Sequence, residues 1–336
     1  MYIVISDSVA VWDRKLQQHL ATAYASGSSK NLRAHWRLYL AFCIDNQLII
    51  FPPQYMNISR FYMYLLSRLT AFASLANYQS SIVNFYKAFG FQLDTNDIIF
   101  KLFNMAAKKS LNTIPSPKLP LQYHHLLQFL QVADMSNPFH MTFINAIVTG
   151  FFALLRRSNI CPPSVAQFDH HKHLTRSDID ISSSALVVNL RWSKTNQHGD
   201  KTFQVPIAAF PGSPLDPPKL FAAFNDTLRV FPRDPCFSFY LHGNHHVLTH
   251  QDLTTMLKAF LRAIGVDGAE YNTHSIRRGG ATLFHMAGVQ SQDIQAHGTW
   301  QSDAYRRYID VPLKHRFRPT KRVFAYLADA HHNVNI

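Results

Sequence analysis

Three prolines stand within seven residues of one another at Pro115, Pro117 and Pro120. Proline fixes its own backbone and lacks an N–H donor, so neither a helix nor a central strand can run through this segment. At 336 residues, the chain is also about twice the size of a common single domain. We therefore expect two domains, 1–112 and 121–336, joined by an extended proline-rich linker at 113–120.

The residues before the linker have the pattern of a helical bundle. Apolar residues recur at intervals of three and four, as in Leu32, Trp36 and Tyr39. Further helical stretches are predicted over 59–69, 75–89 and 97–108, which gives about four or five helices. Basic side chains of this domain are candidates for a DNA-binding face, although scattered solvated charges would give the same pattern. The candidates are Lys30, Arg33, Arg37 and Lys87.

The residues after the linker predict a mainly helical domain with a small antiparallel sheet. A β-hairpin is indicated where 185–192 and 202–207 flank a polar stretch at 195–200. Amphipathic periodicity predicts helices on both sides of it. These helices are expected over 122–132, 139–155, 218–230, 249–264, 274–287, 291–297 and 302–309.

Charge favours a polyanionic partner. Lysine and arginine number 33 against 20 acidic residues, for a net charge of +13. Such an excess attracts nucleic acid, although a basic protein without that role is the alternative. The three cysteines, Cys43, Cys161 and Cys236, are far apart in sequence. We therefore expect neither a disulfide framework nor a zinc knuckle, and a reducing compartment.

Two further expectations are negative. The chain opens without a basic leader, and its longest apolar run, 143–155, is shorter than the roughly 20 residues that span a bilayer. We expect an intracellular protein that is not secreted and does not enter a membrane. Histidines cluster at 170–173 and 242–246, but without carboxylates or cysteines at metal-ligand spacing. We expect no metal and no other cofactor.

Three motifs carry candidate chemistry. The first is Leu-Leu-Arg-Arg-Ser-Asn-Ile at 154–160, which places Arg156 after an apolar helix; a solvated helix end is the alternative. The second is His-Ser-Ile-Arg-Arg-Gly-Gly-Ala-Thr at 274–282, where His274 and Arg277 share one helix face. The third is Gly-Thr-Trp-Gln-Ser-Asp-Ala-Tyr-Arg-Arg-Tyr-Ile at 298–309. A guanidinium suits a phosphate because its planar fork holds two oxygens and never loses its charge near neutral pH.

These motifs resemble the boxes of the tyrosine recombinase (phage integrase) family. The third box is most similar to the recombinases of eukaryotic mobile elements, the cryptons and tyrosine-recombinase retrotransposons. The resemblance implies a helical core-binding domain that clamps DNA, followed by an α+β catalytic domain. It covers nearly the whole chain, with the H-x-x-R and third boxes the more specific matches.

The resemblance also implies a role for each matching residue. Tyr308 would be the nucleophile, with Tyr305, one helical turn earlier, as its rival. The residues that would assist it are Arg156, Lys194, His274, Arg277 and Trp300, with Lys194 protonating the leaving 5′-oxygen. Arg278 is a further candidate DNA contact. Trp300 lies eight residues before Tyr308 where many members have nine, and core packing is the other explanation for it. Asn159 stands where the family usually has Glu or Asp, which would weaken the orientation of the cations.

The implied function is a metal- and ATP-independent recombinase that cuts and rejoins double-stranded DNA through a 3′-phosphotyrosyl intermediate. The family also implies a homotetramer on two DNA sites, no small-molecule substrate, and a nuclear location in a eukaryote or a nucleoid and cytoplasmic one in a prokaryote. Two alternatives stay open: a catalytically impaired DNA-binding protein derived from a mobile element, and a type IB topoisomerase.

Overall fold

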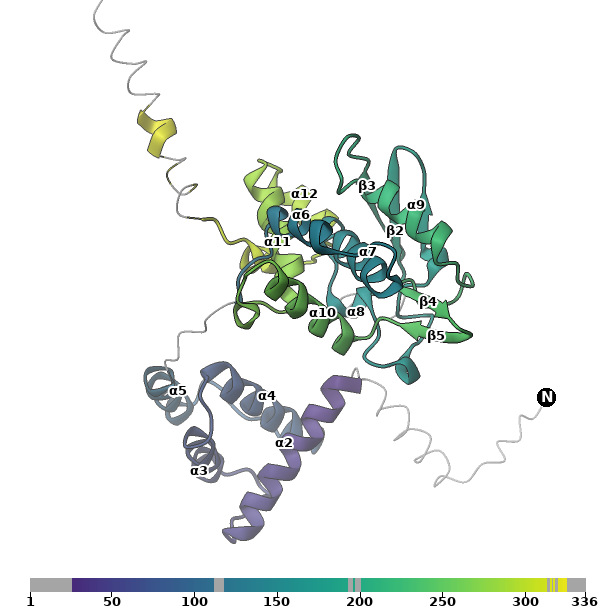
Figure 1. The fold of residues 1–336 in the computed structure, drawn as a ribbon. Coiled ribbons are helices and arrows are strands. Elements are labelled where there is room, and N and C mark those ends of the chain that lie inside the picture. Colours follow the sequence, from purple (N-terminus) through teal and green to yellow (C-terminus); the bar gives the residue numbers. More distant parts are fainter. Residues whose placement is uncertain are drawn as a thin grey trace, which may run out of the picture. The chain divides into compact units, whose positions relative to one another are not determined.

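The computed structural model describes residues 26–111, 118–192, 196, 201–312, 315, 317 and 320–324. The chain divides into two compact units, the N-terminal unit Met1–Ser116 and the C-terminal unit Pro117–Ile336. Most of the predicted linker lies outside the described residues, and the division falls within it. Helices predominate in both units and the sheets are small and antiparallel, which confirms the predicted fold class (Figure 1).

The described part of the N-terminal unit is a bundle of four helices. Aromatic side chains fill its core, with Tyr39, Phe61 and Tyr86 all fully buried. The hydroxyls of Tyr39 and Tyr86 are 2.5 Å apart, and Tyr86 also donates to the carbonyl of Ile50 at 2.9 Å, so these buried polar groups are satisfied. The helices are α2 (Ser26–Asp45), α3 (Tyr55–Leu66), α4 (Phe72–Ala88) and α5 (Ile98–Ser110).

The C-terminal unit is built around one buried helix, α7 (Pro138–Phe152). Asn137 caps its start by accepting from the N–H of Phe139 at 2.9 Å, and Pro138 occupies the first turn, where its missing donor costs nothing. Every residue from Met141 to Phe151 is buried. Despite this apolar stretch, no helix in the described part of the chain is both long and apolar enough to cross a membrane.

Shorter helices surround α7. Along the chain these are α6 (Tyr123–Val132), α8 (Arg157–Ile160), α9 (Pro217–Thr227), α10 (His250–Ala263), α11 (His274–Met286) and α12 (Ser291–His297). Four 3-10 turns accompany them: η1 (Val165–Gln167), η2 (Arg176–Asp178), η3 (Gly268–Glu270) and η4 (Asp303–Tyr308). The predicted helix over 302–309 is therefore a 3-10 turn.

The predicted hairpin is present as β2 (Ala185–Leu190) and β3 (Phe203–Ala208), paired from Ala185 with Ala208 to Leu190 with Phe203. The structure adds β1 (Ile179–Ile181) on the outer side of β2, and a separate hairpin of β4 (Ser238–Leu241) and β5 (Asn244–Val247). Three-residue β1 is too short for a periodic signal. Two residues with positive φ, His242 and Gly243, form the turn of the second hairpin.

Close packing explains the small residues after the H-x-x-R motif. A Cβ on Gly279 would lie 1.8 Å from the carbonyl oxygen of Leu121, and one on Gly280 would lie 2.1 Å from that of Phe151. Helix α11 therefore touches the backbone of α7 on one side and the chain before α6 on another. Leu121 also donates its N–H to the carbonyl of Ser275 at 2.9 Å. The glycines thus fix where α11 presents His274 and Arg277.

Candidate active site

Arg277 is the centre of the site. Its side chain is only 2% exposed, although no carboxylate pairs with it among the described residues. The guanidinium instead donates to two backbone carbonyls, those of Leu154 and of Gly298, the latter at 2.7 Å. Its Nε is buried without a hydrogen-bond partner. A buried cation with no counter-ion and an unused donor is suited to receive an anion.

Two strained residues adjoin the carbonyls that hold Arg277. Leu154 has φ of 51° and presents its own carbonyl; Thr299 has φ of 54° and directly follows Gly298. Left-handed backbone is unfavourable for residues other than glycine, and most of all for a β-branched threonine. The fold maintains strained backbone on both sides of the guanidinium, and such strain clusters at functional sites.

Arg156 supplies a second guanidinium. It lies not on the end of the long apolar helix, which stops at Phe152, but at the N-cap of α8, where its N–H donates to Asn159 at 3.3 Å. Its Nη1 atom is buried without a partner. Burial lowers the pKa of Arg156, and the nearby phenol of Tyr308 opposes that shift. The alternative of a solvated helix end does not describe this side chain.

The charges of Arg156 and Arg277 repel each other. Burial and the charge of Arg156 together lower the pKa of Arg277 to about 9, and Tyr308 acts in the opposite direction. The guanidinium still carries its charge near neutral pH. Arg156 at the start of α8 and Arg277 on α11 therefore lie near the phenol of Tyr308, and neither has a carboxylate partner among the described residues. A bound oxyanion would stabilise these two charges.

Trp300 forms the floor under Arg277. The carbon at the centre of the guanidinium lies 3.7 Å from the centroid of the indole ring, which is a cation–π contact. The indole N–H is buried and has no acceptor. A Cβ on Gly298 would lie 1.7 Å from this ring, so only glycine fits before it. Trp300 therefore packs in the core, and its indole N–H has no acceptor among the described residues. These contacts fit both of its predicted roles, core packing and assistance to Tyr308.

Tyr308 contacts both Trp300 and Arg277, whereas Tyr305 is buried in the core beside Trp300. The Tyr308 ring is 5.4 Å from the Trp300 ring and 5.4 Å from the guanidinium carbon of Arg277, and its side chain is partly exposed. Tyr305 is 2% exposed and packs among Leu154, Ala281 and Ile294. Its hydroxyl bonds with Ser291 and Arg306, which lowers the pKa of Tyr305. The rival tyrosine is thus a core residue whose ring lies 6.2 Å from that of Trp300 and whose hydroxyl bonds with Ser291 and Arg306.

His274 completes the group. By surface area it is exposed, yet the protein packed around its ring desolvates it and lowers its pKa. Arg157, Arg277 and Arg156 lower that pKa further, so the imidazole faces three guanidinium groups. Arg157 is itself exposed, and its charge acts on His274. A neutral imidazole beside unpaired cations can accept a proton.

No family model and no curated protein sequence matches this chain. Solved structures do match. The Tn1549 transposon integrase in complex with transposon right-end DNA aligns with a TM-score of 0.57 at 13% identity, over 92% of this chain and 97% of its own. The chain has the tyrosine recombinase fold.

Two further structures support this assignment of the fold. A lambda integrase dimer bound to a core site has a TM-score of 0.56 at 13% identity, over 90% of this chain and 96% of its own. The XerH site-specific recombinase, in a pre-cleavage complex with its difH substrate, has a TM-score of 0.54 at 15% identity, over 87% and 78%. All three alignments extend over most of the chain, including both units.

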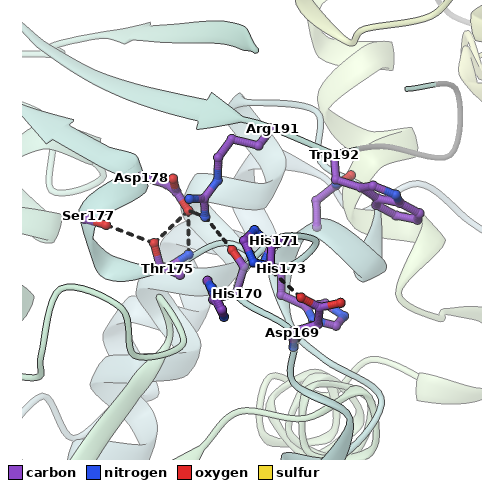
Figure 2. A network of polar contacts seen from close by, with 10 residues as sticks. Asp169, His170, His171, His173, Thr175, Ser177, Asp178, Arg191 and Trp192 are labelled. Atoms are coloured by element: carbon purple, nitrogen blue, oxygen red, sulfur yellow. Dashed lines mark hydrogen bonds and ion pairs between the residues drawn. The ribbon is translucent and has the colours of Figure 1, made fainter. Parts of the chain in front are cut away.

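Lys194, the predicted proton donor, lies outside the described residues. The strand that leads to it is well anchored. Asn159 donates to the carbonyl of Trp192 at 3.2 Å, and Arg191 forms an ion pair with Asp178 at 2.6 Å. Figure 2 shows Asp178 accepting from both Thr175 and Arg191. In this recombinase fold, Asn159 therefore links the backbone at Arg156 to the base of the β2–β3 hairpin, a use that sequence reasoning missed.

The predicted DNA contacts lie in two places. Lys30, Arg33, Arg37 and Lys87 are all exposed, on α2 and α4 of the N-terminal unit. Arg278 forms an ion pair with Asp310 at 3.1 Å, and its contact with DNA stays a prediction.

The histidine clusters have ordinary partners. His173 accepts from the N–H of Asp169 at 3.0 Å, and the rings of His245 and His246 stack on Tyr240 and Phe239. Nowhere in the described part of the chain do three or more potential metal ligands gather. The three cysteines are free and buried.

Proposed function

We propose that this protein is a site-specific tyrosine recombinase that cuts and rejoins double-stranded DNA through a 3′-phosphotyrosyl bond to Tyr308. One observation carries the proposal. Residues from three separate stretches of chain bring buried, unpartnered N–H donors together beside a partly exposed phenol. The donors are Arg156 Nη1, Arg277 Nε and Trp300 Nε1. A phosphate oxygen is the acceptor that such donors lack.

The proposed reaction is a pair of transesterifications. The Tyr308 oxygen attacks the phosphorus and loses its proton to His274, the bond to the 5′-oxygen breaks, and Lys194 protonates that oxygen. Arg156, Arg277 and the Trp300 N–H stabilise the charge that develops on the non-bridging oxygens. A 5′-hydroxyl then attacks the phosphotyrosine and releases Tyr308. Because each step exchanges one phosphodiester for another, bond energy is conserved and ATP is not consumed.

The N-terminal unit would bind the DNA backbone in this proposal. Its exposed cations, Lys30, Arg33, Arg37 and Lys87, suit phosphate contacts that carry affinity without sequence readout. The Tn1549, lambda and XerH proteins of similar fold were solved with DNA. We propose that this chain likewise binds duplex DNA, that four protomers assemble on two sites, and that affinity falls steeply with salt.

We also propose an origin and a location. The Gly-x-Trp-x-Ser-Asp-Ala form of the third box supports descent from a eukaryotic mobile element, and such an enzyme would act in the nucleus. Sequencing the DNA that flanks the gene tests this origin. Terminal or split repeats would support it, and single-copy host DNA without repeats on either side would oppose it.

The direct test of function uses nicked suicide substrates, which release the cleaved end and trap the protein on DNA. Wild-type protein should form an adduct that survives denaturant, and Tyr308→Phe should form none. Tyr305→Phe is the matched control and should retain the adduct if it folds. If wild-type protein forms no adduct on any such substrate, the result favours the alternative of a DNA-binding protein without catalysis. Relaxation of supercoiled DNA by dilute protein without strand exchange would favour a topoisomerase.

A further inference from the structure

The segment that follows Tyr308 is fastened to the helix that carries the H-x-x-R motif. The hydroxyl of Thr282 donates to the carbonyl of Tyr308 at 3.3 Å and accepts from the N–H of Asp310 at 3.0 Å. Thr282 is 2% exposed, so water does not compete for these bonds. One side chain of α11 thus holds the backbone on both sides of Ile309.

A second fastening lies one turn away on the same face of α11. Arg278 and Thr282 are four residues apart, and the guanidinium of Arg278 pairs with the carboxylate of Asp310 at 3.1 Å. The Arg278 side chain is 16% exposed, and its Nε is buried without a partner. Because the pair is partly buried, water and salt screen its attraction less than they screen that of a surface ion pair. Arg278 therefore has a defined position at the end of the nucleophile segment.

Side chains of α11 have two kinds of partner. His274 and Arg277 belong to the group around Tyr308, while Arg278 and Thr282 contact the segment that carries Tyr308. We propose that Thr282 and the Arg278–Asp310 pair are positioning residues that hold Tyr308 against the arginines of its own chain. This inference rests on the proposed recombinase function, and it assigns Arg278 a role other than the predicted DNA contact.

The first test removes the hydroxyl alone. Thr282→Val keeps the shape of the side chain and should slow adduct formation about tenfold, the effect of losing a buried hydrogen bond, with DNA affinity unchanged. Thr282→Ser keeps the hydroxyl and should restore the rate to within about twofold. A Thr282→Val rate equal to wild type overturns the proposal. So does a folded Thr282→Ser that is as slow as Thr282→Val.

The second test uses the ion pair and needs no change in the core. Asp310→Asn should slow adduct formation by about threefold to tenfold. Asp303→Asn is the matched control, because Asp303 pairs with Arg306 at 3.4 Å on the same 3-10 turn while both side chains are 68% exposed. It should leave the rate unchanged. Equal rates for Asp310→Asn and wild type overturn the role of the pair, even if Thr282→Val fails to fold.

The third test determines whether Tyr308 acts with the arginines of its own chain or with those of another protomer. Mixing Tyr308→Phe with Arg277→Ala, or with Arg156→Ala in case the first variant fails to fold, leaves no chain with both groups. We expect no adduct from either mixture. An adduct would show that Tyr308 reaches a neighbour's pocket, which overturns the proposal. An absent adduct from wild-type protein instead removes the proposed function itself, so the two failures are distinguishable.

Discussion

Two buried arginines of the C-terminal unit, Arg176 and Arg277, have opposite surroundings. Arg176 is 7% exposed and all its nitrogens have partners: Nε donates to Cys236 at 3.0 Å, Nη1 to Asn225 at 3.2 Å, and Nη2 to Ser238 at 3.1 Å. It also stacks on Phe224 at 4.2 Å. Arg277 is buried more deeply, yet its Nε is unsatisfied and a second unpaired arginine faces it.

The comparison separates two uses of a buried guanidinium. Burial lowers the pKa of both arginines, so depth alone does not distinguish them. The two arginines differ in whether every nitrogen of the guanidinium has an acceptor. Arg176 ties together η2, the end of α9 and β4, and each of its nitrogens has an acceptor. Arg277 donates to two carbonyls and keeps a buried Nε–H without a partner among the described residues, which is the arrangement of a binding group.

The largest expected effect is on catalysis at Arg277. Arg277→Met should lower the rate of adduct formation by at least about 10²-fold, because it removes a cation that stabilises the transition state. Its free energy of unfolding should change by no more than about 1 kcal/mol, since the lost carbonyl partners are offset by removal of a buried charge. Suicide-substrate kinetics and thermal unfolding measure the two quantities. A folded Arg277→Met variant with wild-type kinetics would contradict the distinction between Arg277 and Arg176.

The same substitution at Arg176 should do the reverse. Arg176→Met strands several buried acceptors and should lower the free energy of unfolding by about 3 kcal/mol. Below its melting temperature the variant should form adduct at the wild-type rate per folded molecule. Denaturant titration beside the adduct assay checks this. A stable but inactive Arg176 variant would place that arginine in the reaction.

A smaller effect concerns acid stability and His125, which is buried near the start of α6. Burial, with a smaller contribution from His124, lowers the pKa of His125 to about 4. The unfolded chain therefore binds more protons between the folded pKa and about 6.5, so stability falls as pH drops through that window. The loss should be about 2 kcal/mol at pH 5 relative to pH 7.5. His125→Gln should flatten the pH dependence of unfolding; an unchanged slope would contradict this.

The smallest effect is that of phosphate itself. An anion between Arg156 and Arg277 should stabilise the protein by ~1.4 kcal/mol at ten times its dissociation constant. It should also raise the pKa of His274, whose neighbours' charges it would offset, and leave that of His125 alone. Imidazole proton signals in an NMR titration with inorganic phosphate report both pKa values. Arg277→Met should abolish the response and Arg176→Met should keep it.

Some of the site was accessible to sequence reasoning. His274 and Arg277 are three residues apart, so any helix puts them on one face, and the glycines after them allow the close approach that α11 makes. The relation between Arg277 and its anchors was not accessible, because Leu154 lies 123 residues away and contributes a backbone carbonyl as acceptor rather than a recognisable side chain. The partner of Arg278 was not accessible for the same reason, because Asp310 pairs with it only after η4 folds back on α11.

The identity of the nucleophile is the central claim, and mapping the adduct tests it most directly. Wild-type protein would be trapped on a suicide substrate, digested with protease and nuclease, and the modified peptide sequenced by mass spectrometry. The account predicts a nucleotide on Tyr308, in the peptide that holds both candidate tyrosines. A nucleotide on Tyr305, which packs in the core facing Ser291, or on any residue outside this segment would contradict it.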